Sequence, residues 1–437
     1  MKAGAHRRRV TPRVERPGWD PALDLPLDDA RRARLNQLAE TVLRRNWREG
    51  TKHGVPYAFT CPATPRYRHQ WYWDSCFHAI VWRRFDPARA RAELRTLLSA
   101  GDPDGLIPHT TFWDHPAMWR RAPFYGTRSF HGDGATATIQ TPLLALAWEL
   151  VADASPDDRG FRTEGIDALR RHYAWLLRER DPDGDGLISI VLPDESGLDD
   201  APKYADAFRW MRHDLPGSWW LIARARRLGY DAGRIAERCD EHVEDVLVNV
   251  FLARSLRALG RLAGEGENGG FWTGRAARIE QALLDRCHDE RTGLFLDLAG
   301  RGERPLTVST WSSLAPLALR DAIPEDVLRR LVEEHLLDPR RYAAPFGIPS
   351  VSMEERSFTP GFDRWRCWRG PSWMVSAWLL VPPLRELGYE REAQRIVTSL
   401  VLATERAGLR EYYNPLTGRG LAAHGFGMSA LLADLVA

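Results

Sequence analysis

Two acidic residues, Asp199 and Glu411, stand in settings that are unusual for surface carboxylates. Asp199 lies in the run Glu-Ser-Gly-Leu-Asp-Asp that begins at Glu195, so three acids fall within six residues on a glycine-containing loop. An acid beside other acids holds its proton more tightly, as a general acid that works near neutral pH must. Glu411 precedes two tyrosines and a tight Asn-Pro turn. A solvated acidic turn and an ordinary surface glutamate are the alternative interpretations.

Aromatic residues surround a third candidate acid. Tyr67, Trp71 and Trp73 lead directly to Asp74. Flat indole faces suit the C–H face of a sugar ring, and a carboxylate accepts strong hydrogen bonds from sugar hydroxyls. We therefore interpret the segment as a sugar subsite and not as a helix interior. The alternative is an aromatic core cluster in which Asp74 caps the following helix.

A second aromatic segment combines a tryptophan pair with an arginine. Trp368 and Trp373 flank the triplet formed by Arg369, Gly370 and Pro371. Pro is favoured in the first turn of a helix, so the triplet predicts a helix start. The segment is a candidate for binding, and the alternative is the start of a core helix.

One acidic loop suggests a cation. Asp181, Asp183 and Asp185, followed by Gly186, match the beginning of an EF-hand calcium loop. The twelfth position of such a loop needs a bidentate Glu, and here it is Leu192. The sequence therefore predicts no metal site, although a cation at this loop remains an alternative. The sequence also lacks H-E-x-x-H, Walker, G-x-S-x-G and G-x-G-x-x-G motifs, and we expect no cofactor.

Composition limits the classes of partner. The 437 residues include 61 basic and 59 acidic ones, and the net charge of +2 gives no strong field for nucleic acid or an anionic membrane. Five dispersed cysteines without a C-x-x-C pair indicate reduced thiols in a cytoplasmic protein. No apolar stretch reaches the roughly 18 residues of a membrane span. We predict a disordered or loosely packed tail at 1–27 and a single domain at 28–437.

Helical spacing of Leu and Ala dominates the chain, which indicates an all-α protein. The best strand candidate is Leu187 to Leu192. The predicted helices are Asp28–Arg45, Ala88–Leu98, Thr141–Asp153, Gly165–Glu179, Ser218–Leu228, Ala236–Leu262, Arg275–Arg286, Glu325–His335, Pro371–Leu387, Glu390–Arg406 and Gly427–Leu435. A polar stretch at 264–270 is the one candidate insert.

The loops between these helices repeat one theme. Asp-Pro-Asp-Gly sequences begin at Asp102 and Asp181, and degenerate forms begin at Asp289 and Asn414. Such residues mark tight turns, and each turn precedes a short apolar pair. Recurrence of one loop type predicts repeated helical hairpins, and the irregular spacing favours a closed ring over an open solenoid.

In their order, these segments resemble the (α/α)6-toroid glycosidases of the glycoside hydrolase family 63 type, and most closely the bacterial mannosylglycerate and glucosylglycerate hydrolases. The shared motifs W-x-W-D, D-G-L-I-P-H, E-S-G-x-D, W-R-G-P-x-W and E-x-Y-x-P-x-T-G extend over nearly the whole chain. The resemblance implies an (α/α)6 toroid and an inverting α-glycosidase that needs no cofactor. It also implies that Asp199 is the general acid and Glu411 the general base. The implied substrate-binding residues are Tyr67, Trp71, Trp73, Asp74, Gln140, Trp368, Arg369, Gly370 and Trp373.

Two departures concern the aglycone side. Relatives carry a tyrosine where this chain has Cys367, and F-S-W-T-A where it has Phe-Gly-Met-Ser-Ala around Gly427 and Met428. We therefore expect a small α-glucoside or α-mannoside as substrate, with weak activity on glycosylglycerates. The alternative function is a catalytically silent carbohydrate-binding or regulatory toroid. A terpene cyclase or sugar epimerase is disfavoured, because neither an aspartate-rich cyclase motif nor a singled-out histidine pair occurs.

Overall fold

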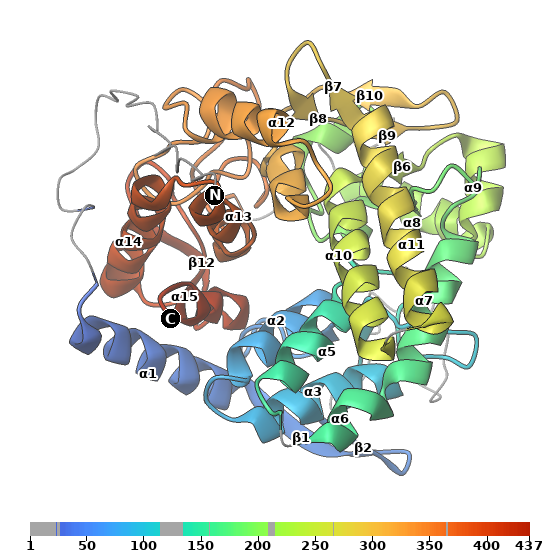
Figure 1. Ribbon diagram of the computed structural model, residues 1–437, viewed down its shortest axis with the longest axis horizontal. Helices are drawn as coiled ribbons and strands as arrows, with labels where there is room; N and C mark the ends of the chain where they lie inside the picture. Colours follow the sequence, from blue (N-terminus) through green and yellow to red (C-terminus); the bar gives the residue numbers. More distant parts are fainter. Residues whose placement is uncertain are drawn as a thin grey trace, which may run out of the picture.

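Helices form most of the computed structural model, which describes residues 23, 27–113, 134–156, 158–208, 215–264, 266–363 and 366–437 (Figure 1). The predicted tail at 1–27 lies outside the described residues except for Leu23 and Leu27. Several helices begin at the capping residues that the sequence offers. The side chain of Asp28 accepts a hydrogen bond from the N–H of Arg31 at the start of α1 (Asp29–Asn46), and Asp86 does the same for Arg89 in α3 (Pro87–Ser99).

One set of helices is apolar on nearly all sides. Every residue of α2 is buried, and α10 is exposed only along a narrow stripe, which is the pattern of helices enclosed by others. These inner helices pack on one another in a closed circuit, the last on the first (Figure 1). In order, they are α2 (Tyr72–Trp82), α5 (Leu144–Asp153), α10 (Val246–Ala263), η5 (Trp311–Leu319), α13 (Met374–Glu386) and η7 (Gly427–Ala430) with α15 (Leu431–Leu435).

A second set is amphipathic and packs outside the first (Figure 1). In α7, for example, a single stripe of five residues is buried, and the opposite face is polar. The outer helices are α1, α3, α6 (Arg159–Glu164), α7 (Ile166–Glu179), α11 (Glu267–Ala282) with η4 (Leu283–Cys287), α12 (Glu325–Arg330) with η6 (Leu331–Leu336), and α14 (Glu390–Ala407). Further elements are α8 (Leu215–Arg227), α9 (Ala232–Cys239), η2 (Pro193–Ser196) and η3 (Pro202–Ala205).

Short antiparallel strands occupy the loops. The predicted strand at 187–192 is confirmed in part, because β5 (Ser189–Ile190) pairs with β6 (Val243–Glu244). These two strands form a sheet with β9 (Asp297–Ala299) and β10 (Arg304–Leu306), in the order β10-β9-β6-β5. The remaining pairs are β1 (Trp47–Lys52) with β2 (Val55–Thr60), β3 (Gln70–Trp71) with β4 (Thr110–Thr111), β7 (His288–Asp289) with β8 (Leu294–Phe295), and β11 (Arg410–Tyr413) with β12 (Gly420–His424).

One predicted helix and the predicted polar insert differ from expectation. The single helix expected at 236–262 is wrong, because α9 ends at Cys239, Asp240 adopts a left-handed conformation (φ 53°), and β6 follows before Asp245 caps α10. The polar stretch at 264–270 is partly helical, since α11 begins at Glu267. A Cβ atom at Gly269 would lie 2.1 Å from the carbonyl oxygen of Gly264, so glycine permits this close approach.

The two aromatic motifs also differ from expectation. Trp73 and Asp74 belong to the first turn of α2. The prediction that this segment does not form a helix interior is therefore wrong. Aromatic residues fit in this helix because all of its residues are buried. The helix predicted to start at Pro371 begins at Met374 instead. The N–H of Ser372 donates to the carbonyl of Tyr413 (2.8 Å), and the carbonyl of Ser372 accepts the reverse bond (2.9 Å), which keeps residues 371–373 extended.

The repeated loops begin with similar side-chain to main-chain hydrogen bonds. The side-chain oxygen of Asp102 accepts hydrogen bonds from main-chain N–H groups three and four residues later, at 2.9 and 3.0 Å. Asp181 accepts bonds from the N–H groups three and five residues later (2.8 and 3.2 Å), and Asn414 from those two and three residues later (2.9 and 3.2 Å). Asp289 accepts one from Arg291 at 3.2 Å. All four loops therefore begin with a side chain that accepts main-chain N–H groups of the residues that follow, as tight turns do, but the bonded positions differ from loop to loop.

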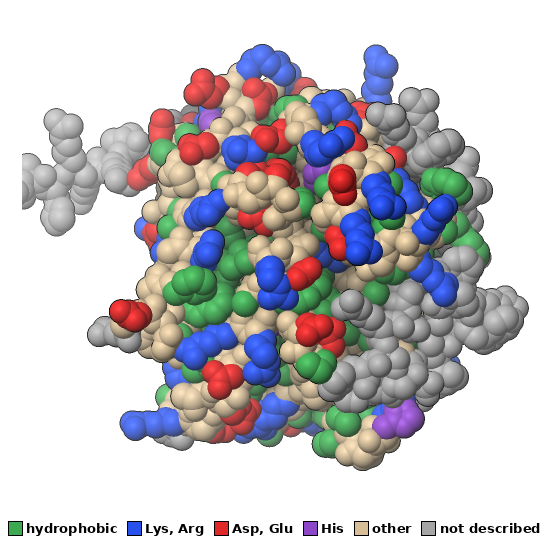
Figure 2. Space-filling model, turned by 90° about the vertical axis from the view of Figure 1, so that its right-hand side faces the viewer, with side chains coloured by type: hydrophobic (Ala, Val, Ile, Leu, Met, Phe, Trp, Pro, Cys, Tyr) green, Lys and Arg blue, Asp and Glu red, His purple; other side chains and the backbone are tan. Residues whose placement is uncertain are grey.

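The outer surface carries mixed charge. On the face in Figure 2, side chains of both signs are interspersed, in keeping with the small net charge. All five cysteines are free thiols, as expected. Among the helices of the described residues, none combines the length and the apolar character that crossing a bilayer requires.

Candidate active site

Glu411 is a buried carboxylate with a defined set of donors. It lies on β11 and is 5% exposed. Its Oε1 atom accepts a hydrogen bond from the Tyr67 hydroxyl (3.0 Å), and its Oε2 atom accepts one from the N–H of Ala423 on β12 (3.0 Å). Burial raises the pKa of Glu411, whereas the Ala423 N–H, the Arg66 guanidinium and the Tyr67 hydroxyl lower it. The carboxylate is thus oriented and poised to accept a proton.

Stacked aromatic rings form a wall beside Glu411. Trp368 and Trp373 stack face to face with their ring centroids 3.9 Å apart, and the ring centroids of Trp373 and Tyr412 are 4.9 Å apart. Trp73 approaches Trp368 at 6.2 Å. Phe426 lies 6.2 Å from Trp373. These contacts bring together segments that are far apart in the sequence, including both predicted aromatic motifs.

The wall continues to the first aromatic motif. The ring of Tyr67 lies 6.2 Å from Phe426 and 5.8 Å from Trp71. Burial raises the pKa of Asp74 to about 7, the nearby His78 opposes this shift, and the charge of Glu411 adds to it. The charge of Glu411 thus acts on Asp74, and the ring contacts of Tyr67 join the segment before Asp74 to Phe426.

The three acids of the run Glu195 to Asp200 have separate surroundings. Glu195 is fully buried and forms a bidentate pair with Arg180 (2.9 and 2.8 Å). It also accepts the N–H groups of Ile139 (3.1 Å) and Val191 (2.8 Å). Breaking such a pair would leave a buried charge, so Glu195 holds the loop in place. The sequence-based view that these acids crowd one another is therefore wrong for Glu195.

Asp200 links the acidic loop to the aromatic wall. Its Oδ1 atom accepts a hydrogen bond from the N–H of Trp368 (3.1 Å) and one from the thiol of Cys367 (3.4 Å). Arg369 Nε lies 3.7 Å from Oδ2. Burial raises the pKa of Asp200 to about 6, although these contacts oppose the shift.

Asp199 is exposed, next to the half-buried Asp200. Burial raises the pKa of the Cys367 thiol, and the charges of Asp200, Asp199 and Glu411 raise it further. Cys367 therefore lies within electrostatic range of both predicted catalytic carboxylates. The structure thus brings Asp199 and Glu411 to one region of the molecule.

The other predicted binding residues support the walls. Gln140 is buried, and its Oε1 atom accepts the N–H of Trp73 (2.9 Å), so its amide nitrogen is the atom that could donate to a sugar. The N–H of Gly370 donates to Ser350 Oγ (2.8 Å), and a Cβ atom there would meet Thr359 main-chain atoms at 2.8 Å. Direct contacts of these residues with a sugar stay predictions.

Sequence reasoning missed several contributors. Arg66 places a guanidinium nitrogen 3.9 Å from Glu411, and Trp311 stacks at 6.4 Å on Trp368. Neither lies in a recognisable pattern. Gly197 could have been found, because it is the glycine of the E-S-G-x-D motif. A Cβ atom there would lie 2.6 Å from the indole of Trp73, and its φ is +78°. The glycine of the E-S-G-x-D motif thus allows the acidic loop to rest on the aromatic wall.

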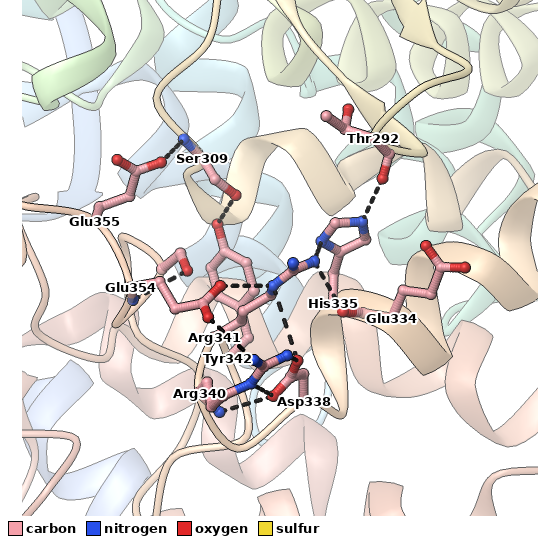
Figure 3. A network of polar contacts seen from close by, with 11 residues as sticks. Thr292, Ser309, Glu334, His335, Asp338, Arg340, Arg341, Tyr342, Glu354 and Glu355 are labelled. Atoms are coloured by element: carbon pink, nitrogen blue, oxygen red, sulfur yellow. Dashed lines mark hydrogen bonds and ion pairs between the residues drawn. The ribbon is translucent and has the colours of Figure 1, made fainter.

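A polar cavity of about 470 Å³ is lined by none of these residues. Figure 3 shows its network, in which Arg341 pairs with Glu354 (2.8 Å) and donates to His335 Nδ1 (2.8 Å). His335 Nε2 in turn contacts the carbonyl of Thr292 (2.9 Å). These contacts connect η6 with the loops that contain Thr292 and Glu354.

A buried carboxylate beside an aromatic wall, on a helical scaffold, is the arrangement of a carbohydrate-active site, and the comparisons show that this chain is a glycoside hydrolase. Residues 67–429 match the family described as "Mannosylglycerate hydrolase MGH1-like glycoside hydrolase domain", and the chain belongs to that family.

Similar proteins match this chain over most of its length and most of their own. The mannosylglycerate hydrolase of Rubrobacter radiotolerans is 30% identical over 442 residues, which cover 91% of this chain and 96% of that protein. The glucosylglycerate hydrolase of Mycolicibacterium hassiacum is 27% identical, covering 83% and 90%. The crystal structure of the family 63 mannosylglycerate hydrolase from Thermus thermophilus with Tris superposes with a TM-score of 0.80 at 28% identity, covering 92% of this chain and 99% of that one.

Proposed function

We propose that this glycoside hydrolase inverts the anomeric configuration of small α-glucosides or α-mannosides, with Asp199 as general acid and Glu411 as general base. The observation that carries the proposal is the setting of Glu411. Two directed hydrogen-bond donors, Tyr67 and Ala423, hold its carboxylate beside the aromatic wall, and burial favours its taking up a proton. Asp199 lies on the loop that Asp200 attaches to the other side of the wall.

The proposed reaction needs no cofactor. Asp199 donates its proton to the glycosidic oxygen, and the bond between that oxygen and the anomeric carbon breaks. Glu411 removes a proton from a water molecule, whose oxygen attacks the anomeric carbon from the opposite face. Carboxyl groups about 6.5–9.5 Å apart leave room for this water. The hexose leaves as the β-anomer, and the aglycone leaves with the proton from Asp199.

We also propose the finer architecture. The closed circuit of inner helices, each backed by an outer helix, supports an (α/α)6 toroid that forms one domain over residues 28–437. The motif segments would then meet at one mouth of the toroid. The substrate would be a small carbohydrate, and the free thiols agree with a location in the cytoplasm.

The aglycone side supports a substrate that differs from those of the named relatives. Cys367 contributes a short thiol, which is bonded to Asp200, where a tyrosine hydroxyl could reach a carboxylate. Gly427 has no side chain, and a Cβ atom there would lie 2.3 Å from Nε2 of His78. We therefore propose weak action on mannosylglycerate and glucosylglycerate compared with another small α-linked hexoside.

Proton NMR during hydrolysis tests the reaction class. Purified protein is incubated with trehalose, kojibiose, nigerose, glucosylglycerate and mannosylglycerate, and the anomeric proton of the released hexose is followed before mutarotation. We expect the β-anomer to appear first from any substrate that is hydrolysed. Initial release of the α-anomer contradicts the inverting mechanism. Failure to hydrolyse a wider panel of α-glucosides and α-mannosides contradicts the substrate class.

A further inference from the structure

Lys203 is a buried lysine that the proposed mechanism does not use. It lies in η3 and is 2% exposed. It is one of three lysines among the 61 basic residues of the chain, and the other two are Lys2 and Lys52. A buried ammonium group is costly unless anions and hydrogen-bond acceptors surround it. The contacts of Lys203 must therefore account for its burial.

Three acceptors from three different elements surround the Lys203 ammonium group. Its Nζ atom donates to Asp245 Oδ2 (2.6 Å) and to Ser312 Oγ (2.8 Å), and it pairs with Asp297 Oδ2 at 2.8 Å. Asp245 caps α10, Ser312 belongs to the first turn of η5, and Asp297 lies on β9. An ammonium group has three rotatable N–H donors, and each finds an acceptor here. The planar guanidinium of arginine, the common cation of this chain, would not reproduce this arrangement.

The two carboxylates that bind Lys203 are themselves fixed. Asp245 Oδ1 accepts the N–H of Val248 (3.0 Å), and Asp297 Oδ1 accepts the N–H of Val246 (2.8 Å). Burial lowers the pKa of Lys203, but the charges and hydrogen bonds of Asp245 and Asp297 outweigh burial, so the pKa is raised and the ammonium group stays ionised. Lys203 thus attaches η3 to the first turns of two inner helices, α10 and η5.

Asp199 lies in a tight turn that ends directly before η3. The N–H of Ala201 donates to the carbonyl of Leu198 (2.9 Å), so Asp199 and Asp200 are the two central residues of a β-turn. Leu198, at the start of the turn, is fully buried. Lys203 follows the end of the turn by two residues. The exposed Asp199 therefore belongs to a turn that is anchored in the protein interior on both sides.

We propose that Lys203 is a positioning residue, which holds the turn of Asp199 against α10 and η5 so that the carboxyl group stays within reach of the glycosidic oxygen. This inference rests on the proposed role of Asp199 as general acid. Lys203 itself neither touches the substrate nor transfers a proton. Proton transfer requires hydrogen-bond distance, so a small displacement of a general acid lowers the rate strongly. Loss of the Nζ contacts should therefore lower kcat more than it raises KM.

Leaving-group dependence separates a displaced general acid from general damage to the protein. An alcohol leaves the anomeric carbon with the proton of the general acid, whereas fluoride is a weak base and leaves without one. The two substrates are the preferred small α-hexoside of the panel and the α-glycosyl fluoride of the same hexose. A displaced Asp199 should slow hydrolysis of the α-hexoside and leave fluoride release nearly unchanged. A variant that is only less folded should lose both activities equally.

Ser312→Ala and a charge-balanced double variant test the contacts of Lys203. Ser312→Ala removes one acceptor of Nζ and leaves both ion pairs in place, so this protein should fold. Lys203→Met combined with Asp297→Asn removes one positive and one negative charge together, which avoids an excess of buried anions. We expect kcat/KM for the α-hexoside to fall about threefold in Ser312→Ala and at least about tenfold in the double variant, with less than about a twofold change for the fluoride. If the double variant does not fold, Ser312→Ala alone decides.

Ser399→Ala is the matched control. Ser399 is also buried, on the outer helix α14, where its Oγ atom accepts the N–H of Gly347 (2.9 Å), and this variant should hydrolyse both substrates like the parent. Asp199→Asn should show the selective loss in full. If it does not, the assignment of the general acid fails, and the positioning role fails with it. If Asp199→Asn shows the selective loss but the folded Lys203-contact variants lose both activities equally, or lose neither, the positioning role alone is overturned.

Discussion

The carboxylate of Asp200 accepts a hydrogen bond from the main-chain N–H of Trp368 at 3.1 Å, across 168 residues of sequence. This contact ties the loop that carries Asp199 to the aromatic wall. Asp200→Ala should leave the Trp368 N–H unpaired, cost about 1–3 kcal/mol of stability, and lower kcat because the loop loses its attachment. Urea unfolding and steady-state kinetics measure the two effects.

Asp200→Asn is the matched control, because its amide oxygen can still accept that N–H. The pKa of Asp200 is raised to about 6 from an ordinary 3.8, so the folded protein holds this proton more tightly than the unfolded chain does. The ionised form therefore reduces stability as the pH rises from about 4 through about 6. Asp200→Asn should be at least as stable as the parent at pH 7. Equal losses of stability in Asp200→Ala and Asp200→Asn would show that the charge of Asp200 stabilises the protein and that the hydrogen bond from the Trp368 N–H does not.

Tyr67 provides a second test, through the hydroxyl that donates to Glu411. This bond favours the ionised carboxylate and lowers the pKa of Glu411, whereas burial raises it. Tyr67→Phe should therefore raise the pKa, and the acid limb of the kcat/KM profile should move to higher pH. The same change at Tyr389, whose hydroxyl donates to Glu333 on the outer helix η6, is the control and should leave the profile unchanged. If the acid limb of the kcat/KM profile does not move in Tyr67→Phe, the ionisation of Glu411 does not produce that limb.

Gly427 and His78 should behave as a coupled pair. A Cβ atom at position 427 would lie 2.3 Å from His78 Nε2, so Gly427→Ala should cost about 1–3 kcal/mol of stability. In a His78→Ala background the same substitution should cost at least about 1 kcal/mol less, since the obstructing ring is gone. Denaturant unfolding of the four proteins measures this coupling. Additive effects would mean that something other than His78 excludes a side chain at 427.

The features that could be predicted from the sequence are those set by residues that lie close together along the chain. Helical periodicity locates most helices, and the contiguous motifs identify Glu411, Asp74 and the wall tryptophans. The remaining features depend on contacts across many residues. Glu195 and Asp200 look alike in the sequence, yet one pairs with Arg180 inside the protein and the other faces Trp368. Trp311 stands outside any motif and reaches the wall only through the packing of η5.

Substrate preference offers a further test, because the family resemblance implies a tyrosine at position 367, where this chain has Cys367 with its thiol bonded to Asp200. We expect kcat/KM for mannosylglycerate and glucosylglycerate to be lower than for the preferred small α-hexoside of the panel. Cys367→Tyr should narrow that difference, and Cys367→Ser, which keeps a short donor, should not. A low-micromolar KM for either glycosylglycerate would show that other residues bind the glycerate carboxylate.

The catalytic pair is the last prediction. A positioned proton donor or acceptor contributes about 10²–10⁴-fold, so Asp199→Asn and Glu411→Gln should each lower kcat by that factor. The pH profile of the parent should be bell-shaped, and each variant should lose one limb. Asp199 is exposed, so its amide variant should fold like the parent. Glu411 is buried, but a glutamine can still accept the Ala423 N–H and contact the Tyr67 hydroxyl, and a loss of no more than about 1 kcal/mol is expected.

Azide distinguishes the role of Glu411 from a loss of folding. Removal of the base in Glu411→Ala should leave space on the side from which water attacks, and azide should give at most weak rescue as a β-configured glycosyl azide. Glu355→Gln is a control for the loss of a carboxylate, since Glu355 accepts the N–H of Ser309 in the separate polar cavity, and its kcat should match the parent. Near-normal kcat in Asp199→Asn or Glu411→Gln would remove that residue from the mechanism. An α-configured azide would mean that the nucleophile enters from the other face, which contradicts inversion by Glu411-activated water.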